Sequence, residues 1–150
     1  MINAKIILAP VDFSEYSFKN LQNAIDLAKT FKAKLIILHV LPDKEQCLKF
    51  CSVNPDLDNM DKMAEENARK NMQEFEKRIP EIKYIEHEFK IRRGIAYSEI
   101  LKEIKESFVD VLIIGAKGVS NLDDFIYGSV TEKVIKKSPV TTIITRKNAD

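Results

Sequence analysis

The chain has 150 residues, of which 45% are apolar and 31% are charged, a composition typical of a globular protein with one core and no disordered regions. Its 24 basic and 23 acidic residues leave a net charge of +1 and are interspersed along the chain, which argues against nucleic acid as a partner. No apolar stretch approaches the roughly 18 to 20 residues that cross a bilayer, and the amino terminus lacks a signal-peptide layout, so we predict a cytoplasmic protein without a membrane partner.

Five stretches of the chain predict strands. Residues 4–10 (AKIILAP), 33–41 (AKLIILHVL) and 109–116 (VDVLIIGA) are short apolar runs rich in branched side chains, the pattern of strands buried on both faces of a parallel sheet. Residues 83–94 (KYIEHEFKIRRG) alternate apolar and polar side chains, which predicts a half-exposed strand near a sheet edge. Residues 139–147 (PVTTIITRK) predict the last strand.

Four helices are predicted between these strands, because apolar residues recur there at helical spacing. Their apolar stripes are Leu21, Ala24, Ile25, Ala28 and Phe31 in the first; Met60, Met63, Ala64, Ala68, Met72, Phe75 and Ile79 in the second; Ile95, Ile100, Leu101, Ile104 and Phe108 in the third; the fourth spans residues 129–138. We interpret the methionines as core filling, with a recognition groove as the alternative.

The alternation of strands and helices predicts an α/β fold. We expect one domain over residues 1–150, with a five-stranded parallel sheet in the order 3-2-1-4-5 and helices on both faces. Residues 41–59 are long for a loop in a compact domain. They are expected either to fold partly as a helical turn or to act as a flap.

The cysteines and histidines do not form a metal-binding pattern. Cys47 and Cys51 can share one face of a helix, but there is no second cysteine pair, and His39 and His87 are isolated in the sequence. A closed zinc site needs four ligands, so we predict no protein metal site and reduced, inert thiols.

Three of the four glycines fall within residues 115–129, directly after the fourth predicted strand. In an open parallel sheet a ligand binds beyond the carboxyl ends of the strands, where the strand order reverses, and this stretch and PVDFS (10–14) both face that point. A phosphate can approach Gly115 and Gly118 closely, and Gly128 and Ser129 open a helix whose unpaired amides favour an anion. The structural alternative is a strand end, a turn and a helix cap.

Several neighbours of this crevice have two possible roles. The amides of Val130 and Thr131 extend the phosphate cradle, and Lys117 can add positive charge. Asp12 can accept hydrogen bonds from a nucleoside, although DFSE also predicts a capping box with Asp12 as the N-cap and Glu15 three residues on. His39 is expected to be structural rather than catalytic, and the main chain of Val40 is the better candidate for contacting a base.

Familiar nucleotide-binding motifs are absent. The chain contains neither GxxxxGK[ST] nor a GxGxxG after the first strand, and PVDFS lacks the SGGxDS-type loop of adenylating pyrophosphatases. A phosphate cradle of another kind is therefore expected.

The glycine spacing resembles a known family signature. Gly115-Ala-Lys-Gly118, nine further residues and Gly128-Ser129 are similar to the G-2x-G-9x-G-(S/T) motif of the ATP-binding class of universal stress proteins. ILAPVDFSEYS, LIILHVL, RRGIAYSEILKEI and SPVTTIITR resemble further segments of that family in the same order, so the resemblance covers essentially the whole chain.

The resemblance implies a flavodoxin-like fold and an ATP site. The nucleoside would contact Pro10, Val11, Asp12 and the Val40 main chain. The residues expected to hold ribose and phosphates are Gly115, Gly118, Gly128, Ser129 and Val130. A divalent ion, Mg²⁺ or Mn²⁺, would accompany the phosphates. The family also implies a homodimer through the last strand, whose residues 140–145 offer an exposed edge.

One feature departs from the family pattern. Asp123 and Asp124 occupy positions that are often basic in relatives, and carboxylates turned toward a triphosphate would weaken its binding.

The arrangement of metal ligands, water-orienting group and arginine needed for fast phosphoryl transfer is not evident, so at most slow or partner-dependent ATP hydrolysis is expected. The predicted function is a nucleotide-responsive switch, and the alternative is an interaction protein of the same fold that binds no nucleotide.

Overall fold

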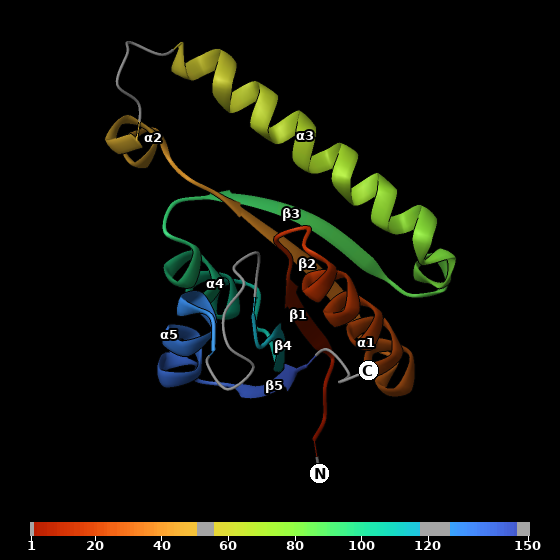
Figure 1. The fold of residues 1–150 in the computed structure, drawn as a ribbon. Coiled ribbons are helices and arrows are strands. Elements are labelled where there is room, and N and C mark those ends of the chain that lie inside the picture. Colours follow the sequence, from red (N-terminus) through yellow and green to blue (C-terminus); the bar gives the residue numbers. More distant parts are fainter. Residues whose placement is uncertain (1, 51–55, 118–126, 147–150) are drawn as a thin grey trace.

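The structure, a computed structural model, describes residues 2–50, 56–117 and 127–146. Its centre is a five-stranded parallel sheet in the order β3-β2-β1-β4-β5 (Figure 1). The strands are β1 (Ile6–Pro10), β2 (Lys34–Leu41), β3 (His87–Arg93), β4 (Val111–Gly115) and β5 (Thr141–Thr145). The predicted α/β class and strand order are confirmed.

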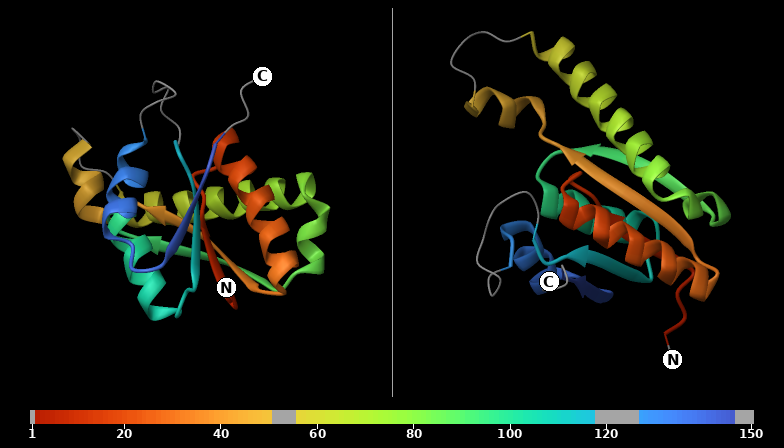
Figure 2. Two further views of the ribbon diagram at one scale, coloured as in Figure 1. Left: turned by 90° about the horizontal axis from the view of Figure 1, so that it is seen from below. Right: turned by 45° about the vertical axis from the view of Figure 1, so that its right-hand side comes forward.

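Helices cover both faces of the sheet. They are α1 (Glu15–Phe31), α2 (Lys44–Phe50), α3 (Leu57–Arg78), α4 (Ala96–Glu106) and α5 (Ser129–Lys137), with a 3₁₀ helix, η1 (Pro80–Tyr84), before β3. Figure 2 shows α1 and α3 on one side of the sheet and α4 and α5 on the other. None of the helices in the described parts of the chain is long and apolar enough to cross a membrane.

Successive side chains of the central strands point to opposite faces of the sheet, so the core has two layers. Ile7 and Ile37 pack toward α1 and α3, whereas Leu8 and Ile36 pack toward α4 and α5. Leu8 lies in register with Ile36 of β2 and Leu112 of β4, so β1 is enclosed on both edges and both faces. A continuous apolar run is what such a position requires.

The structure corrects the start of the predicted edge strand and decides part of the prediction for residues 41–59. The predicted edge strand includes residues 83–86, but β3 begins at His87. The 3₁₀ helix η1 occupies Pro80–Tyr84, and its first residue is a proline, which suits the start of a helix. For residues 41–59 the sequence predicts either a helical turn or a flap, and Lys44–Phe50 form the helix α2. Residues 51–55 lie outside the described part.

Some residues of the predicted apolar stripes are exposed rather than buried. Ala68, Met72, Phe75 and Ile79 of α3 are buried, but Met60 and Met63 at its amino end are 40% and 54% exposed. Exposed positions also include Phe31, Ile95 and Phe108. Figure 1 shows the amino-terminal part of α3 extending past β3 toward α2, so that the stripe continues where there is no sheet to cover it.

Candidate functional site

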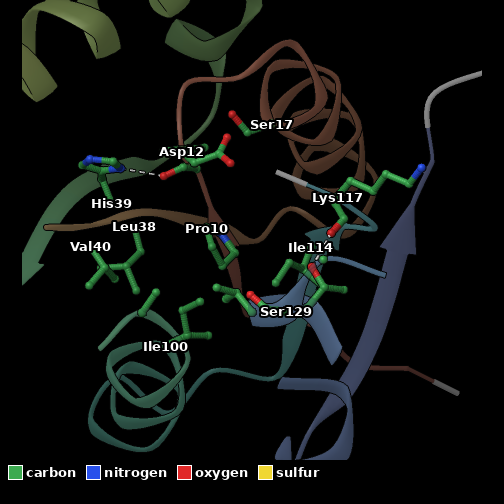
Figure 3. Close-up of a pocket in the computed structure, with 16 residues that line it drawn as sticks. Pro10, Asp12, Ser17, Leu38, His39, Val40, Ile100, Ile114, Lys117 and Ser129 are labelled. Atoms are coloured by element: carbon green, nitrogen blue, oxygen red, sulfur yellow. Dashed lines mark hydrogen bonds between the residues drawn. The ribbon is translucent and has the colours of Figure 1, made fainter. Parts of the chain in front are cut away.

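A cavity of about 250 Å³ lies at the carboxyl ends of β1, β2 and β4, beside the amino-terminal ends of α4 and α5 (Figure 3). It is at the point where the strand order reverses, which is where the topology predicts a ligand. Its lining comprises Pro10, Val11, Asp12, Ser17, Leu38, His39, Val40, Ala96, Ile100, Ile114, Gly115, Lys117, Gly128, Ser129, Val130 and Thr131.

Every described residue of the predicted site lines this cavity. The two loops, separated by about a hundred residues in sequence, and Val40 from β2 come together around one space. Gly118, Asp123 and Asp124 lie outside the described residues, so their predicted positions stay predictions.

The loop between β1 and α1 is fixed by main-chain contacts. The Val11 amide donates to the Leu38 carbonyl at 2.8 Å, which continues the pairing of β1 with β2 by one residue. Phe13 then takes a left-handed conformation with φ 63°, a strained geometry for a residue other than glycine. Its ring contacts His39 and Phe75 at centroid distances of 4.7 and 5.3 Å, so packing holds the turn in place.

Asp12 is not the N-cap of α1, which corrects the capping prediction. Ser14 is the N-cap, and its hydroxyl accepts from the Ser17 amide at 3.1 Å. The Asp12 carboxylate instead accepts from the Ser14 amide at 3.0 Å and from the Ser14 hydroxyl. The sequence offers two candidate caps two residues apart, and Phe13 places the second at the helix start. Asp12 lines the cavity with its second carboxylate oxygen available for hydrogen bonding.

His39 has the structural role that we predicted. Its Nδ1 lies 2.7 Å from the Val11 carbonyl oxygen, which can only accept, so Nδ1 carries the proton and donates. Burial lowers the pKa of His39 below its usual value and outweighs the opposing effects of this hydrogen bond and the Asp12 charge. The neutral imidazole thus supports the turn that carries Val11 and Asp12.

This environment predicts a pH-dependent stability. An unfolded His39 has a pKa of about 6.5 and binds a proton more readily than the folded one, so stability is complete above that pH and falls as the pH drops below it. The variant His39→Gln keeps a donor but does not titrate. Urea unfolding at pH 7.5 and 5.5 should show a smaller loss of stability on acidification in this variant than in the wild type; an equal loss in both would contradict the account.

The turn between β4 and α5 forms the opposite wall. A Cβ on Gly115 would lie 3.3 Å from the Lys117 carbonyl oxygen, so close approach of the main chain explains this glycine. The Thr131 hydroxyl donates to the Gly115 carbonyl at 2.8 Å, and the Gly128 amide donates to the Ala116 carbonyl at 2.9 Å. These two bonds hold the start of α5 against the end of β4.

The first turn of α5 offers amide donors to the cavity. Gly128 is its N-cap and, having no side chain, provides no capping hydrogen bond, in contrast to Ser14 at α1. Ser129, Val130 and Thr131 line the cavity directly after it. Their amides, together with the positive end of the helix dipole, can bind an anionic group.

The cavity is apolar at one end. Figure 3 shows Leu38, Val40 and Ile100 together on one side, whereas the Lys117 side chain extends away from Pro10 and Ser129. Lys117 is nevertheless buried, with 6% of its surface exposed. Its ammonium therefore does not point between the two loops as a phosphate ligand would require.

Some lining residues were not predicted. Leu38 is two residues before Val40 and lies on the same face of β2. Because side chains two residues apart in a strand share a face, the prediction for Val40 could have been extended to Leu38. Ala96 and Ile100 are four residues apart at the start of α4, and their helical spacing would indicate a shared face. Ile114 and Ser17 complete the set. The prediction considered the loops after β1 and β4 and left out the helix that follows β3.

In the parts of the chain that the structure describes, no three histidine, cysteine, aspartate or glutamate side chains gather closely enough to hold a metal ion.

Comparison with known proteins decides the family. Residues 3–146 match the universal stress protein family. The chain belongs to this family. It is 34% identical to universal stress protein MJ0577 of Methanocaldococcus jannaschii, over 97% of each chain. Two family structures share the fold: UspA of Lactobacillus plantarum (TM-score 0.78, 23% identity, 96% and 99% covered) and a protein of Archaeoglobus fulgidus in complex with dAMP (0.63, 20%, 96% and 98%).

Proposed function

We propose that residues 1–150 act as one domain that binds an adenine nucleotide, ATP, and changes its interactions according to whether the nucleotide is bound. The observation that carries this proposal is the cavity at the switch point, which has an apolar end between β2 and α4 and an uncapped helix start at α5. A nucleoside phosphate has the matching division into an apolar base and an anionic tail.

The nucleoside would occupy the apolar end. Leu38, Val40, Ala96 and Ile100 supply side-chain walls there, and the Val40 main chain is adjacent for hydrogen bonds to a base. Asp12, at the end of β1, would accept a ribose hydroxyl through the carboxylate oxygen that Ser14 does not use. The dAMP bound by the Archaeoglobus fulgidus protein supports adenine as the base class.

The phosphates would lie against the turn from β4 to α5. Close approach at Gly115 and the amides of Ser129, Val130 and Thr131 suit an anion, and Gly118 completes the proposed cradle. A divalent ion, Mg²⁺ or Mn²⁺, would take most of its ligands from the phosphates and water, as Mg²⁺ does in many nucleotide sites.

The lining favours binding over rapid hydrolysis. No arginine lines the cavity among the described residues, and the carboxylate of Asp12 is held by Ser14. Fast phosphoryl transfer needs positioned groups of these kinds around the reacting phosphate. We therefore propose a switch with at most slow hydrolysis, and the rival is an interaction protein of the same fold that binds no nucleotide.

Purified protein provides the test. After denaturation, the supernatant is separated by ion-exchange chromatography and its ultraviolet absorbance is compared with nucleotide standards. We expect adenine nucleotide at a substantial fraction of the protein concentration. A supernatant without nucleotide, together with no thermal stabilisation by saturating ATP, would favour the rival.

We further propose that two copies pair through β5 in the cytoplasm, where the nucleotide is abundant. β5 ends the sheet order, and Ile143 and Ile144 are only partly buried, so its outer edge leaves main-chain groups and apolar surface to cover. Sedimentation equilibrium should give twice the chain mass. Thr141→Lys, at an exposed position of the strand, should shift the equilibrium toward single chains; a monomeric wild type would contradict the proposal.

A further inference from the structure

Six charged side chains form a cluster between β3 and α4, directly beside the apolar end of the cavity. They are Lys90, Arg92, Glu99, Lys102, Glu103 and Glu106. The Arg92 guanidinium lies at the centre, with Nε 2.9 Å from Glu99 Oε2 and Nη1 at 2.6 Å from Glu103 Oε2 and 2.8 Å from Glu106 Oε2. One side chain of β3 thus holds three carboxylates of one helix.

The centre of the cluster is removed from solvent, whereas Glu106 and Lys102 at its rim are 62% and 56% exposed. Glu103 and Glu99 are 2% and 8% exposed. Burial alone would raise the pKa of Glu103, but hydrogen bonds from Ser107, Lys90 and Arg92 outweigh it and lower that pKa. Lys90 and Lys102 complete the pairing at 2.9 and 3.0 Å, so the three cations balance the three carboxylates. Loss of one partner would leave an uncompensated charge in this space.

The strand register places this cluster next to the cavity wall. Arg92 lies beside Val40 and Lys90 beside Leu38 in the pairing of β2 with β3. Val40 and Leu38 line the cavity, and so do Ala96 and Ile100 of α4, the same helix that carries the three carboxylates. The ion pairs of Arg92 with Glu99 and Glu103 therefore join β3 to α4 beside the Val40 wall and the α4 wall of the cavity.

The turn that leads into α4 is shaped around the same carboxylate. Gly94 has φ 142°, a conformation that favours glycine, and a Cβ there would lie 2.8 Å from Glu99 Oε1. Its amide donates to the Leu41 carbonyl at 2.9 Å, which fixes the turn at the end of β2. The start of α4, including Ala96, is thus held by main chain on one side and by the ion cluster on the other.

We propose that Arg92 is a positioning residue for the nucleoside end of the site, and that by holding Glu99 and Glu103 it sets the width of the slot between Val40 and α4 that receives the base. The inference rests on the proposed nucleotide binding. Arg92 does not line the cavity and acts through the position of Ala96 and Ile100.

Arg93 offers a matched control. It is the next residue of β3, points to the opposite face of the sheet and pairs with Asp61 at 3.1 Å and Glu65 at 3.3 Å of α3. Its removal also breaks two ion pairs of the edge strand, but none of these partners lines the cavity.

The test compares Arg92→Met, Arg92→Lys and Arg93→Met by calorimetric titration with ATP, GTP and inorganic tripolyphosphate. We expect Arg92→Met to lower ATP affinity about tenfold, which corresponds to about 1.4 kcal/mol, and to reduce the ATP preference over GTP. Tripolyphosphate affinity should change much less than ATP affinity, because the amides that would bind phosphate belong to α5 and not to α4. Arg92→Lys should fall between Arg92→Met and wild type, and Arg93→Met should match wild type.

Two results would overturn the inference. The first is equal ATP affinity in Arg92→Met and Arg93→Met, and the second is a parallel loss for ATP and tripolyphosphate, which would indicate general loosening. If Arg92→Met does not fold, Glu99→Gln and Arg92→Lys supply the same comparison with smaller perturbations. Failure of the wild type to bind ATP would instead remove the proposed function itself.

Discussion

Gly128→Val is expected to lower ATP affinity by about 100-fold or more, roughly 2.7 kcal/mol, while the protein still folds. Gly128 is the N-cap of α5, is buried, and has φ −58° and ψ 153°, which valine adopts without strain. Its branched side chain would occupy the space through which phosphate oxygens approach the amides of Ser129 and Val130. The stability cost should be about 1 kcal/mol or less, because valine is only a poor N-cap.

Calorimetric titration with ATP and urea unfolding together measure both parts of this prediction. Gly128→Ala adds a single methyl group and should have an intermediate affinity. A folded Gly128→Val variant with wild-type ATP affinity would place the phosphates away from α5, and a variant that loses its fold would show that Gly128 is structural.

Asn20→Leu is expected to destabilise the fold by about 2 to 4 kcal/mol, because it leaves two polar partners without their hydrogen bonds. The Asn20 side chain is completely buried; its Nδ2 donates to the Ile113 carbonyl at 3.1 Å, and its Oδ1 accepts from the Thr145 hydroxyl at 2.7 Å. These bonds tie α1 to β4 and β5, next to Gly115.

Asn23→Leu is the matched control on the same helix. Asn23 is half-buried and makes none of these bonds, so its replacement should change the free energy of unfolding by less than about 0.5 kcal/mol. Urea unfolding of both variants decides between the expectations. Equal effects would mean that the cost at Asn20 is a packing cost, not one of lost hydrogen bonds.

The sheet was predictable because its central strands must be apolar on both faces. Residues 6–10, 34–41 and 111–115 are enclosed by neighbouring strands and by helices, and only a continuous apolar run meets that requirement. The edge strand β3 was predicted from its alternation, but its start was not. Pro80 and η1 define that start through local geometry, which the period does not reveal.

Exposure along the helices was less predictable. A period of 3.6 marks one face of a helix, but it does not show how far the covering sheet extends. The 22 residues of α3 are about 33 Å long, more than the strands beneath it can cover, so Met60 and Met63 remain exposed while Met72 is buried. Phe108 has φ 52° in the turn after α4 and is 82% exposed.

The candidate site was predictable where topology alone determines it. The loops after β1 and β4 must face the point where the strand order reverses, and their described residues do line the cavity there. The wall from α4 was not predicted, because the position of Ala96 depends on how Gly94 and the Arg92 cluster orient the helix. Such tertiary contacts leave no periodic pattern in the sequence from which they could be predicted.

The central claim is that this cavity binds ATP, and one calorimetric titration tests it most directly. Protein freed of bound nucleotide by unfolding and refolding is titrated with ATP in the presence of Mg²⁺. We predict saturable binding of one ATP per chain that is competed by AMP. The absence of saturable heat at millimolar ATP, with the protein shown to be folded by circular dichroism, would contradict the claim.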